Sequence, residues 1–310
     1  MRVAVCFWFM ACAVVGQETR PSSHETPTSR PASASPDRQA ASKPTTQVSN
    51  WAAILEEKPD PKVVSDPTHR RAIETTHLPW RVRDKSSGIE LVLIPPGNYW
   101  RGASNEDTEA TADEKPIRNV VIVSSFYIGR FEVTNAQFKR FRREHNSTDW
   151  FGQRLNADEQ PVVSVSWDDA VGFCIAHGIR LPTEDEWEYT CRAGTASTTY
   201  RDLDSVAWFS ENSLGVSHPV GKKSPNAFGV YDMLGNAAEL CSDSFETKDP
   251  LVQEVEEIFR KTQTRPRRVD VRALRGGNWF TPATCRASYR AGLGRTFVSP
   301  VIGFRVVRDP

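Results

Sequence analysis

Short apolar runs that end at Pro or Gly indicate β-strands early in the folded part of the chain. Residues 89–94 are mostly apolar and are followed directly by Pro95, Pro96 and Gly97. Because proline cannot donate a hydrogen bond to a sheet ladder, such a run ends where the prolines begin. Residues 119–128 form a second run rich in β-branched and aromatic residues. We therefore expect two strand-forming regions here.

Three helix starts are marked by capping boxes, in which a Ser or Thr precedes an acid or Gln by three positions. The boxes are Thr134 to Gln137, Ser166 to Asp169 and Thr183 to Glu186. In such a pair each side chain accepts a hydrogen bond from the other residue's backbone N–H, which begins the helix. Gly178 and Gly194 are placed to end the second and third helices. The acids at 184–186 lie in a first turn, where the helix dipole stabilises them, so capping is favoured over catalysis.

The N-terminus has the pattern of a secretory signal peptide. The basic Arg2 precedes an apolar run, residues 3–15, that is too short to span a bilayer. Cleavage after Gly16 makes residues 1–16 the signal peptide and exports the mature chain, which is then secreted, periplasmic or part of the cell envelope. A lipid anchor on Cys12 is the alternative, and it is the one membrane contact that the sequence suggests.

The segment that follows has the composition of a linker. Residues 17–50 are rich in Ser, Thr, Pro and Ala and contain little that can be buried, which predicts disorder. Residues 51–77 are an N-terminal extension, and the sequence leaves open whether it packs on the domain. Within it, residues 51–55 are expected to form a short helix. The folded domain is expected to span residues 78–310.

Composition narrows the classes of function. The 310 residues are 38% hydrophobic, enough for one sizeable core, and 39 basic residues balance 39 acidic ones. Without net charge or a long basic block, nucleic acid is not an expected partner. Nine Trp, 18 Gly and 21 Pro indicate a loop-rich fold with aromatic anchors. Six scattered histidines argue against a histidine-ligated catalytic metal.

Two carboxylates flank a Gly-Asn turn in the stretch 231–239. Asp232 and Glu239 stand seven positions apart, with Gly235 and Asn236 between them. Because Gly and Asn permit sharp turns, the backbone here can present carbonyl oxygens beside both carboxylates. Calcium prefers such all-oxygen ligation. The spacing alone leaves two interpretations open, a calcium site and an ordinary turn with solvated acids.

Four longer motifs in a fixed order favour the calcium site. They are LVLIPPG (91–97), RLPTEDEWEY (180–189), RGG (275–277) and IGFR (302–305). With the stretch 231–239 they resemble the sulfatase-modifying factor, or formylglycine-generating enzyme, family over about residues 78–310. The resemblance implies a single, loop-rich α+β domain related to the C-type-lectin fold. In the family's oxidases, copper(I) and oxygen convert a cysteine of a sulfatase to formylglycine.

The resemblance also implies which residues hold calcium. Asp232 and Glu239 take the places of side-chain ligands, and Gly235 and Ala237 take those of carbonyl ligands. The expected role of the ion is to stabilise a structure that has few regular elements.

A second calcium site is implied at Asn212 and Ser213, through a side-chain oxygen and a backbone carbonyl. Relatives complete this site with an acid on a longer loop, whereas residues 214–219 are short and contain none. Ala238 and Leu240 also replace tryptophans of the family. The loss of two large aromatic side chains is expected to reshape the adjoining cleft.

The cysteine pair of the copper oxidases is incomplete in this chain. Those enzymes use two thiolates five positions apart, since copper(I) is a soft ion and its site needs both. Here only Cys285 is present, the partner position falls on Phe280 or Thr281, and Asn278 replaces a serine of the motif. We therefore do not expect copper. Cys285 is a catalytic candidate only if the chain is an enzyme, and otherwise a structural thiol or a disulfide partner.

Disulfide pairing is left open by the sequence. Four cysteines remain after removal of the signal peptide, Cys174, Cys191, Cys241 and Cys285. They allow three pairings, and an exported location permits disulfides. Our hypothesis is a bond between Cys191 and Cys285.

An insertion-like segment spans about residues 246–270. Residues 252–260 have helical spacing of apolar positions, and Glu256 and Arg260 stand one turn apart. A solvated surface helix and a partner-binding arm are both open interpretations.

The motifs together predict an exported, calcium-stabilised binding or accessory module without oxidase chemistry. Its expected ligand is a peptide or glycan, bound in the cleft where relatives hold a sulfatase peptide. The alternative is a formylglycine-generating oxidase with a sulfatase-type client. A third class, an inert structural domain of the cell envelope displayed on the linker, is also open.

Overall fold

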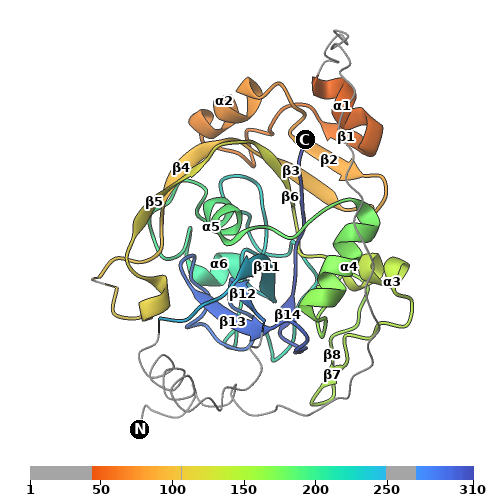
Figure 1. Ribbon diagram of the computed structural model, residues 1–310, viewed down its shortest axis with the longest axis vertical. Coiled ribbons are helices and arrows are strands. Elements are labelled where there is room, and N and C mark those ends of the chain that lie inside the picture. Colours follow the sequence, from red (N-terminus) through yellow and green to blue (C-terminus); the bar gives the residue numbers. More distant parts are fainter. Residues whose placement is uncertain (1–43, 106, 249–269) are drawn as a thin grey trace, which may run out of the picture. The chain divides into compact units, whose positions relative to one another are not determined.

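The computed structural model describes residues 44–105, 107–248 and 270–310, which lie in one compact unit, Ser42–Pro310 (Figure 1). The predicted signal peptide, most of the predicted linker and the helical pattern at 252–260 lie outside the described residues. Within the described part, no helix is long and apolar enough to cross a membrane.

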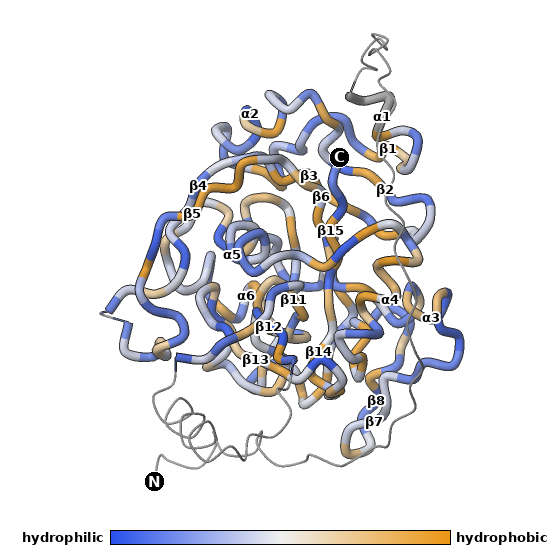
Figure 2. Tube along the Cα trace, in the orientation of Figure 1, coloured by the Kyte–Doolittle hydropathy of each residue, from blue (hydrophilic) through white to orange (hydrophobic). Residues whose placement is uncertain are grey.

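A five-stranded antiparallel sheet contributes strands to the main hydrophobic core, in the order β1-β2-β3-β6-β15. Its strands are β1 (Ala52–Glu56), β2 (Arg81–Asp84), β3 (Glu90–Ile94), β6 (Phe126–Gly129) and β15 (Val307–Arg308). The predicted strand at 89–94 is therefore confirmed as β3, and Figure 2 shows β3 and β6 as hydrophobic stretches. The last strand of the chain pairs with β6, Val307 opposite Ile128, so the C-terminus is held in the sheet.

The segment before the predicted domain packs on the domain, and the predicted disorder is wrong for residues 44–50, which lie in a helix. It forms α1 (Pro44–Trp51), β1 and α2 (Pro67–Thr75). Val48 and Ile73 have no exposed surface. The prediction of a helix at 51–55 is wrong: the helix ends at Trp51, and β1 pairs antiparallel with β2. Pairing with the sheet edge overrides the modest helix propensity of this short run.

A second sheet of four strands has the order β13-β12-β11-β14. Its strands are β11 (Ala238–Ser244), β12 (Val271–Arg275), β13 (Arg290–Gly294) and β14 (Ile302–Gly303). Glu239 on β11 stands opposite Arg275 on one side and Gly303 on the other. Three of the sequence motifs therefore meet across this sheet.

Short ladders and turns complete the domain. They are β4 (Gly97–Arg101) with β5 (Arg118–Ile122), β7 (Asp149–Trp150) with β8 (Gln153–Arg154), β9 (Ala207–Trp208) with β10 (Leu234–Gly235), the 3-10 turn η1 (Ala112–Glu114) and α6 (Leu203–Val206). The run predicted at 119–128 is thus divided between β5 and β6. The prediction of a loop-rich α+β domain is confirmed.

All three predicted capping boxes are present. They begin α3 (Asn135–Phe141), α4 (Trp167–His177) and α5 (Glu184–Arg192). Gly178 ends α4 in the left-handed conformation as expected, whereas α5 ends one residue earlier than predicted, at Ala193. Helix α5 contacts β4 and β5 as well as β11 and β12. It therefore lies between the β4–β5 ladder and the four-stranded sheet.

Candidate cation site and the turn around Cys285

Asp232 lies in a strained turn and is almost completely buried. Its φ is 52°, in the left-handed region. Oδ2 accepts a hydrogen bond from the backbone N–H of Gly221 at 2.6 Å. Oδ1 is buried and has no hydrogen-bond partner in the described part of the chain. An unpartnered buried carboxylate oxygen is costly, so a bound cation or water is the natural occupant beside it.

Glu239 is also buried, but its carboxylate is already engaged. Arg305 donates from Nε to Oε2 and from Nη2 to Oε1, both at 2.6 Å. The indole Nε1 of Trp187 donates to Oε2 at 2.7 Å. Arg305 also donates to the backbone carbonyls of Gly129, at 2.9 Å, and Tyr231, at 3.0 Å. The arginine therefore ties Glu239 to the backbone beside Asp232.

The turn between the two acids is held by Glu132, which the sequence did not single out. Its Oε1 accepts from the backbone N–H of Ala237 at 2.8 Å, and its Oε2 accepts from Nδ2 of Asn236 at 2.7 Å. Glycine is required at 235, because φ is 75° and a Cβ would lie 2.3 Å from the carbonyl oxygen of Trp208. The only sequence signal for Glu132 is its place just before the first capping box.

Three buried carboxylates share one buried guanidinium in this cluster of Glu132, Asp232, Glu239 and Arg305. Burial, and then the charges of Asp232 and Glu239, raise the pKa of Glu132 well above its usual value. Burial also raises the pKa of Asp232 to about 6, against the opposing effects of the Gly221 N–H and Arg305. The cluster has an excess of negative charge that a cation would relieve.

The residues present fit a calcium ion in chemistry. Asp232 offers a free carboxylate oxygen, and the turn it begins carries the carbonyls of Gly235 and Ala237. Glu239 fits only if it shares its carboxylate between the ion and Arg305. No group of three or more His, Cys, Asp or Glu side chains in the described residues is arranged to hold a metal. Any ion would therefore depend on backbone oxygens as much as on side chains.

Asn212 and Ser213, the candidates for a second ion, are engaged with their own loop. The side-chain oxygen of Asn212 accepts from the backbone N–H of Phe209 at 2.9 Å. The carbonyl oxygen of Ser213 lies 2.8 Å from Nε2 of His218. Both predicted ligand oxygens thus already accept or face a protein donor. A second calcium ion stays a prediction.

The turn around Cys285 buries its thiol. Sγ lies 3.3 Å from the carbonyl oxygen of Thr281 and 3.7 Å from that of Asn278. Burial raises the pKa of Cys285 to about 12, so the thiol stays protonated at neutral pH. The side-chain oxygen of Asn278 accepts from the backbone N–H of Phe280 at 2.9 Å and closes the turn. The residues that replace the second cysteine therefore supply turn contacts and no second thiolate.

The predicted bond between Cys191 and Cys285 is wrong. The four cysteines among the described residues, Cys174, Cys191, Cys241 and Cys285, are all free and buried. Sγ of Cys191 contacts the carbonyl oxygen of Met233, whereas that of Cys285 faces its own turn. The thiols of Cys191 and Cys285 therefore face different backbone carbonyls, because α5 and the turn after β12 present them to separate parts of the core.

Ala238 and Leu240, which the resemblance placed where the family has tryptophan, lie in the second sheet. Ala238 and Leu240 on β11 are buried in the core. Aromatic side chains gather beside the Cys285 turn, where the partly exposed Trp150 packs edge-to-face against the buried Trp279, with ring centroids 6.2 Å apart. Phe151 and Phe280 next to them are 91% and 57% exposed. We call Trp150, Phe151 and Phe280 the aromatic face.

Comparison with known proteins agrees with this architecture. The family profile described as Sulfatase-modifying factor enzyme 1-like domain matches residues 80–310. The solved structure of PvdO from Pseudomonas aeruginosa has a TM-score of 0.62 and 24% identity, covering 74% of this chain and 98% of that chain. At this identity the likeness concerns the fold alone.

Two named relatives differ in how much of their length is matched. Inactive C-alpha-formylglycine-generating enzyme 2 of Bos taurus is 25% identical over 273 residues, covering 68% of this chain and 83% of that protein. Serine/threonine-protein kinase pkn1 of Chlamydia pneumoniae is 28% identical over 249 residues, covering 71% of this chain and only 38% of that protein. The chain therefore spans well under half of the kinase-named relative.

Proposed function

This chain belongs to the sulfatase-modifying factor family, and we propose that it serves as an exported binding or accessory module that performs no cysteine oxidation. The observation that carries the proposal is the buried thiol of Cys285, which faces the carbonyls of Thr281 and Asn278. Copper(I) needs two exposed thiolates, and a client cysteine must reach them. A relative is named as an inactive formylglycine-generating enzyme, which supports a non-catalytic member.

The aromatic face is the proposed binding surface, and its ligand is a peptide or a glycan. Exposed rings of this kind stack on sugar rings or cover apolar peptide side chains. Phe151 lies at the tip of the hairpin formed by β7 and β8, and Phe280 lies in the Cys285 turn. Two separate loops thus contribute to one surface, beside the turn that in oxidases carries the copper site.

One calcium ion is the proposed cofactor, with Asp232 and Glu239 as side-chain ligands and Gly235 and Ala237 as carbonyl ligands. The unpartnered Oδ1 of Asp232 and the excess of buried negative charge support it. When bound, the ion would neutralise the cluster and hold the turn in place. Glu132 would act on it indirectly, by fixing the backbone of the turn.

The decisive experiment is a peptide assay with the mature protein. A sulfatase-derived peptide containing cysteine is incubated with the protein, copper(I), oxygen and a thiol reductant, and is analysed by mass spectrometry beside an active relative. We expect an unchanged peptide and no stoichiometric binding of copper(I). Formation of aldehyde that disappears in Cys285→Ser would establish the oxidase instead.

Binding is tested on a glycan array and a peptide array. The wild-type protein is expected to retain ligands that the variant Phe151→Ala/Phe280→Ala loses. Val123→Ala is the matched control, because Val123 is an apolar side chain with 82% exposure elsewhere on the domain. If neither array retains the wild-type protein, the inert structural domain becomes the better interpretation.

A further inference from the structure

A charged pocket of about 240 Å³ opens beside α5, where β4 and β5 approach the second sheet. Its lining contains four carboxylates and six cationic side chains, which are Arg101, Lys115, Arg118, Lys248, Arg275 and Arg290. None of the lining residues belongs to the aromatic face or to the Asp232 cluster. The pocket is therefore a separate feature of the domain.

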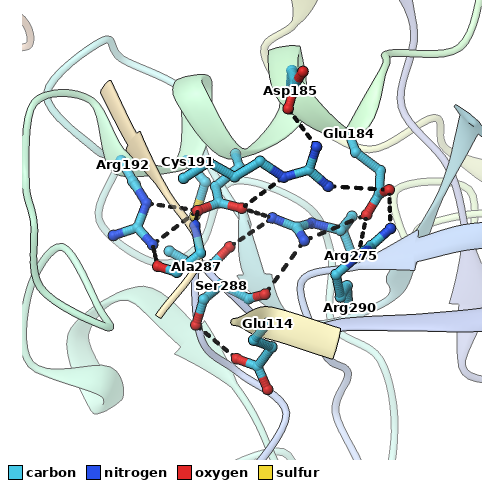
Figure 3. A network of polar contacts seen from close by, with 12 residues as sticks. Glu114, Glu184, Asp185, Cys191, Arg192, Arg275, Ala287, Ser288 and Arg290 are labelled. Atoms are coloured by element: carbon cyan, nitrogen blue, oxygen red, sulfur yellow. Dashed lines mark hydrogen bonds and ion pairs between the residues drawn. The ribbon is translucent and has the colours of Figure 1, made fainter. Parts of the chain in front are cut away.

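The floor of the pocket is a cross-linked set of ion pairs (Figure 3). Glu184 accepts from Nε of Arg290 at 2.9 Å and lies 3.2 Å from Nη2 of Arg101. Arg275, which is fully buried, pairs with Glu188 and lies 3.5 Å from Glu184. The first-turn acid Glu184 is thus part of this network in addition to its place at a helix start. The buried guanidinium groups are neutralised by these carboxylates.

The other two carboxylates of the lining also have protein donors. Glu114 accepts from Nη1 of Arg286 at 2.6 Å and from Oγ of Ser288 at 2.7 Å. Asp113 accepts from Oγ1 of Thr247 at 2.9 Å and from the backbone N–H of Lys248. No carboxylate of the described lining is therefore left to pair with the two lysines.

The remaining positive charge lies at the mouth of the pocket. Nζ of Lys115 donates to the carbonyl of Asp107 at 2.8 Å, and Nζ of Lys248 donates to the carbonyl of Lys115 at 2.7 Å. Both partners are neutral. Arg118 is 58% exposed, and it lies 3.6 Å from the carboxylate of Asp185. Three cationic side chains, Lys115, Lys248 and Arg118, therefore line one opening. Among the described residues, Asp185 lies beside Arg118, and Asp113 accepts from the backbone N–H of Lys248.

We propose that this pocket binds a tetrahedral oxyanion, a phosphate or sulfate group, either free or as a small ester. The lining carries six cationic side chains and four carboxylates, and Asp185 just outside it pairs with Arg101 and Arg118, so the pocket keeps an excess of positive charge that attracts an anion. Lysine and arginine are the side chains that hold phosphate and sulfate through charge-assisted hydrogen bonds. A preformed, ion-paired floor keeps Arg101 and Arg290 in fixed orientations, which lowers the entropic cost of binding.

The test is titration calorimetry of the folded protein with inorganic phosphate, inorganic sulfate and methyl phosphate at constant ionic strength. The proposal expects saturable binding of at least one of them. It also expects the double variant Lys115→Gln/Lys248→Gln to bind about a hundredfold more weakly, since each lost charge-assisted bond is worth about a factor of ten. Binding by methyl phosphate as well as phosphate would identify esters as ligands, and binding of the inorganic ions alone would identify the free anion.

Lys62→Gln is the matched control, because it removes one exposed lysine that does not line the pocket. It is expected to bind as the wild type does. Absence of saturable binding by all three anions would overturn the proposal, as would an equal loss in the control. Thermal melting of each variant without ligand establishes that the comparison is between folded proteins.

Discussion

Arg305 donates two parallel hydrogen bonds of 2.6 Å to the carboxylate of Glu239 in the centre of the domain. Both residues are fully buried. The pair joins the last motif of the chain to β11. Buried pairs of this kind are costly to break, because removal of one partner leaves an uncompensated charge.

Removal of the arginine is therefore expected to destabilise the fold strongly. Arg305→Met should lower the free energy of unfolding by about 3 to 5 kcal/mol, measured by urea denaturation. Arg295→Met is the control, since Arg295 pairs with Asp168 at the surface, and exposed pairs contribute little. Similar losses in the two variants would contradict a special role for the buried pair.

Calcium is expected to raise the melting temperature of the wild-type protein, and EDTA to reverse the effect. Binding to the folded state alone stabilises it by mass action. Asp232→Asn should lose most of the response, because Oδ1 of Asp232 is the buried oxygen without a partner. Asp149→Asn, on the exposed hairpin strand β7, should keep the response. A calcium response that survives in Asp232→Asn would place the ion elsewhere.

Replacement of Gly235 by alanine should lower the stability of the fold more than the same replacement at Gly215. Both have positive φ, 75° and 76°, but only at 235 would a Cβ meet a backbone atom, the carbonyl oxygen of Trp208 at 2.3 Å. Gly215→Ala should cost only backbone strain of about 1 kcal/mol, and Gly235→Ala should cost clearly more. Chemical denaturation of both variants tests this, and equal costs would argue against the tight turn.

The cysteines should be unreactive in the folded protein and should all react with a thiol reagent after denaturation without reductant. Burial raises the pKa of Cys174, Cys191 and Cys285 to about 12 in each case. Thiols missing after denaturation would indicate disulfides.

Because of the same buried thiols, the free energy of unfolding is expected to depend on pH in the alkaline range. An unfolded thiol ionises near its ordinary pKa of about 8.5, whereas these buried thiols keep their protons. The folded state then binds more protons, so stability is full below that value and is expected to fall as pH rises above it towards 12. Cys285→Ser should show a weaker fall, which urea denaturation at pH values on both sides of 9 would measure.

Local elements were accessible from the sequence because their determinants lie within a few residues. The three capping boxes and the strand β3 are set by spacings of three positions and by a run ended at Pro95. The helix predicted at 51–55 was wrong because the determinant of this segment lies far away in the sequence. It becomes a strand only because β2, which begins 25 residues after the end of β1 at Glu56, offers it an edge.

The motif positions determined the family, the turn at 231–239 and the lack of a cysteine pair. Tertiary structure alone decided that Glu132 holds that turn from more than one hundred positions away, with Asn236 as partner. It alone decided that Arg305 occupies the carboxylate of Glu239 and that Lys115 and Lys248 meet at one pocket mouth. Buried charge and pocket shape depend on which side chains the fold brings together from distant parts of the chain. The spacing of residues along the sequence does not show which of them become neighbours in space.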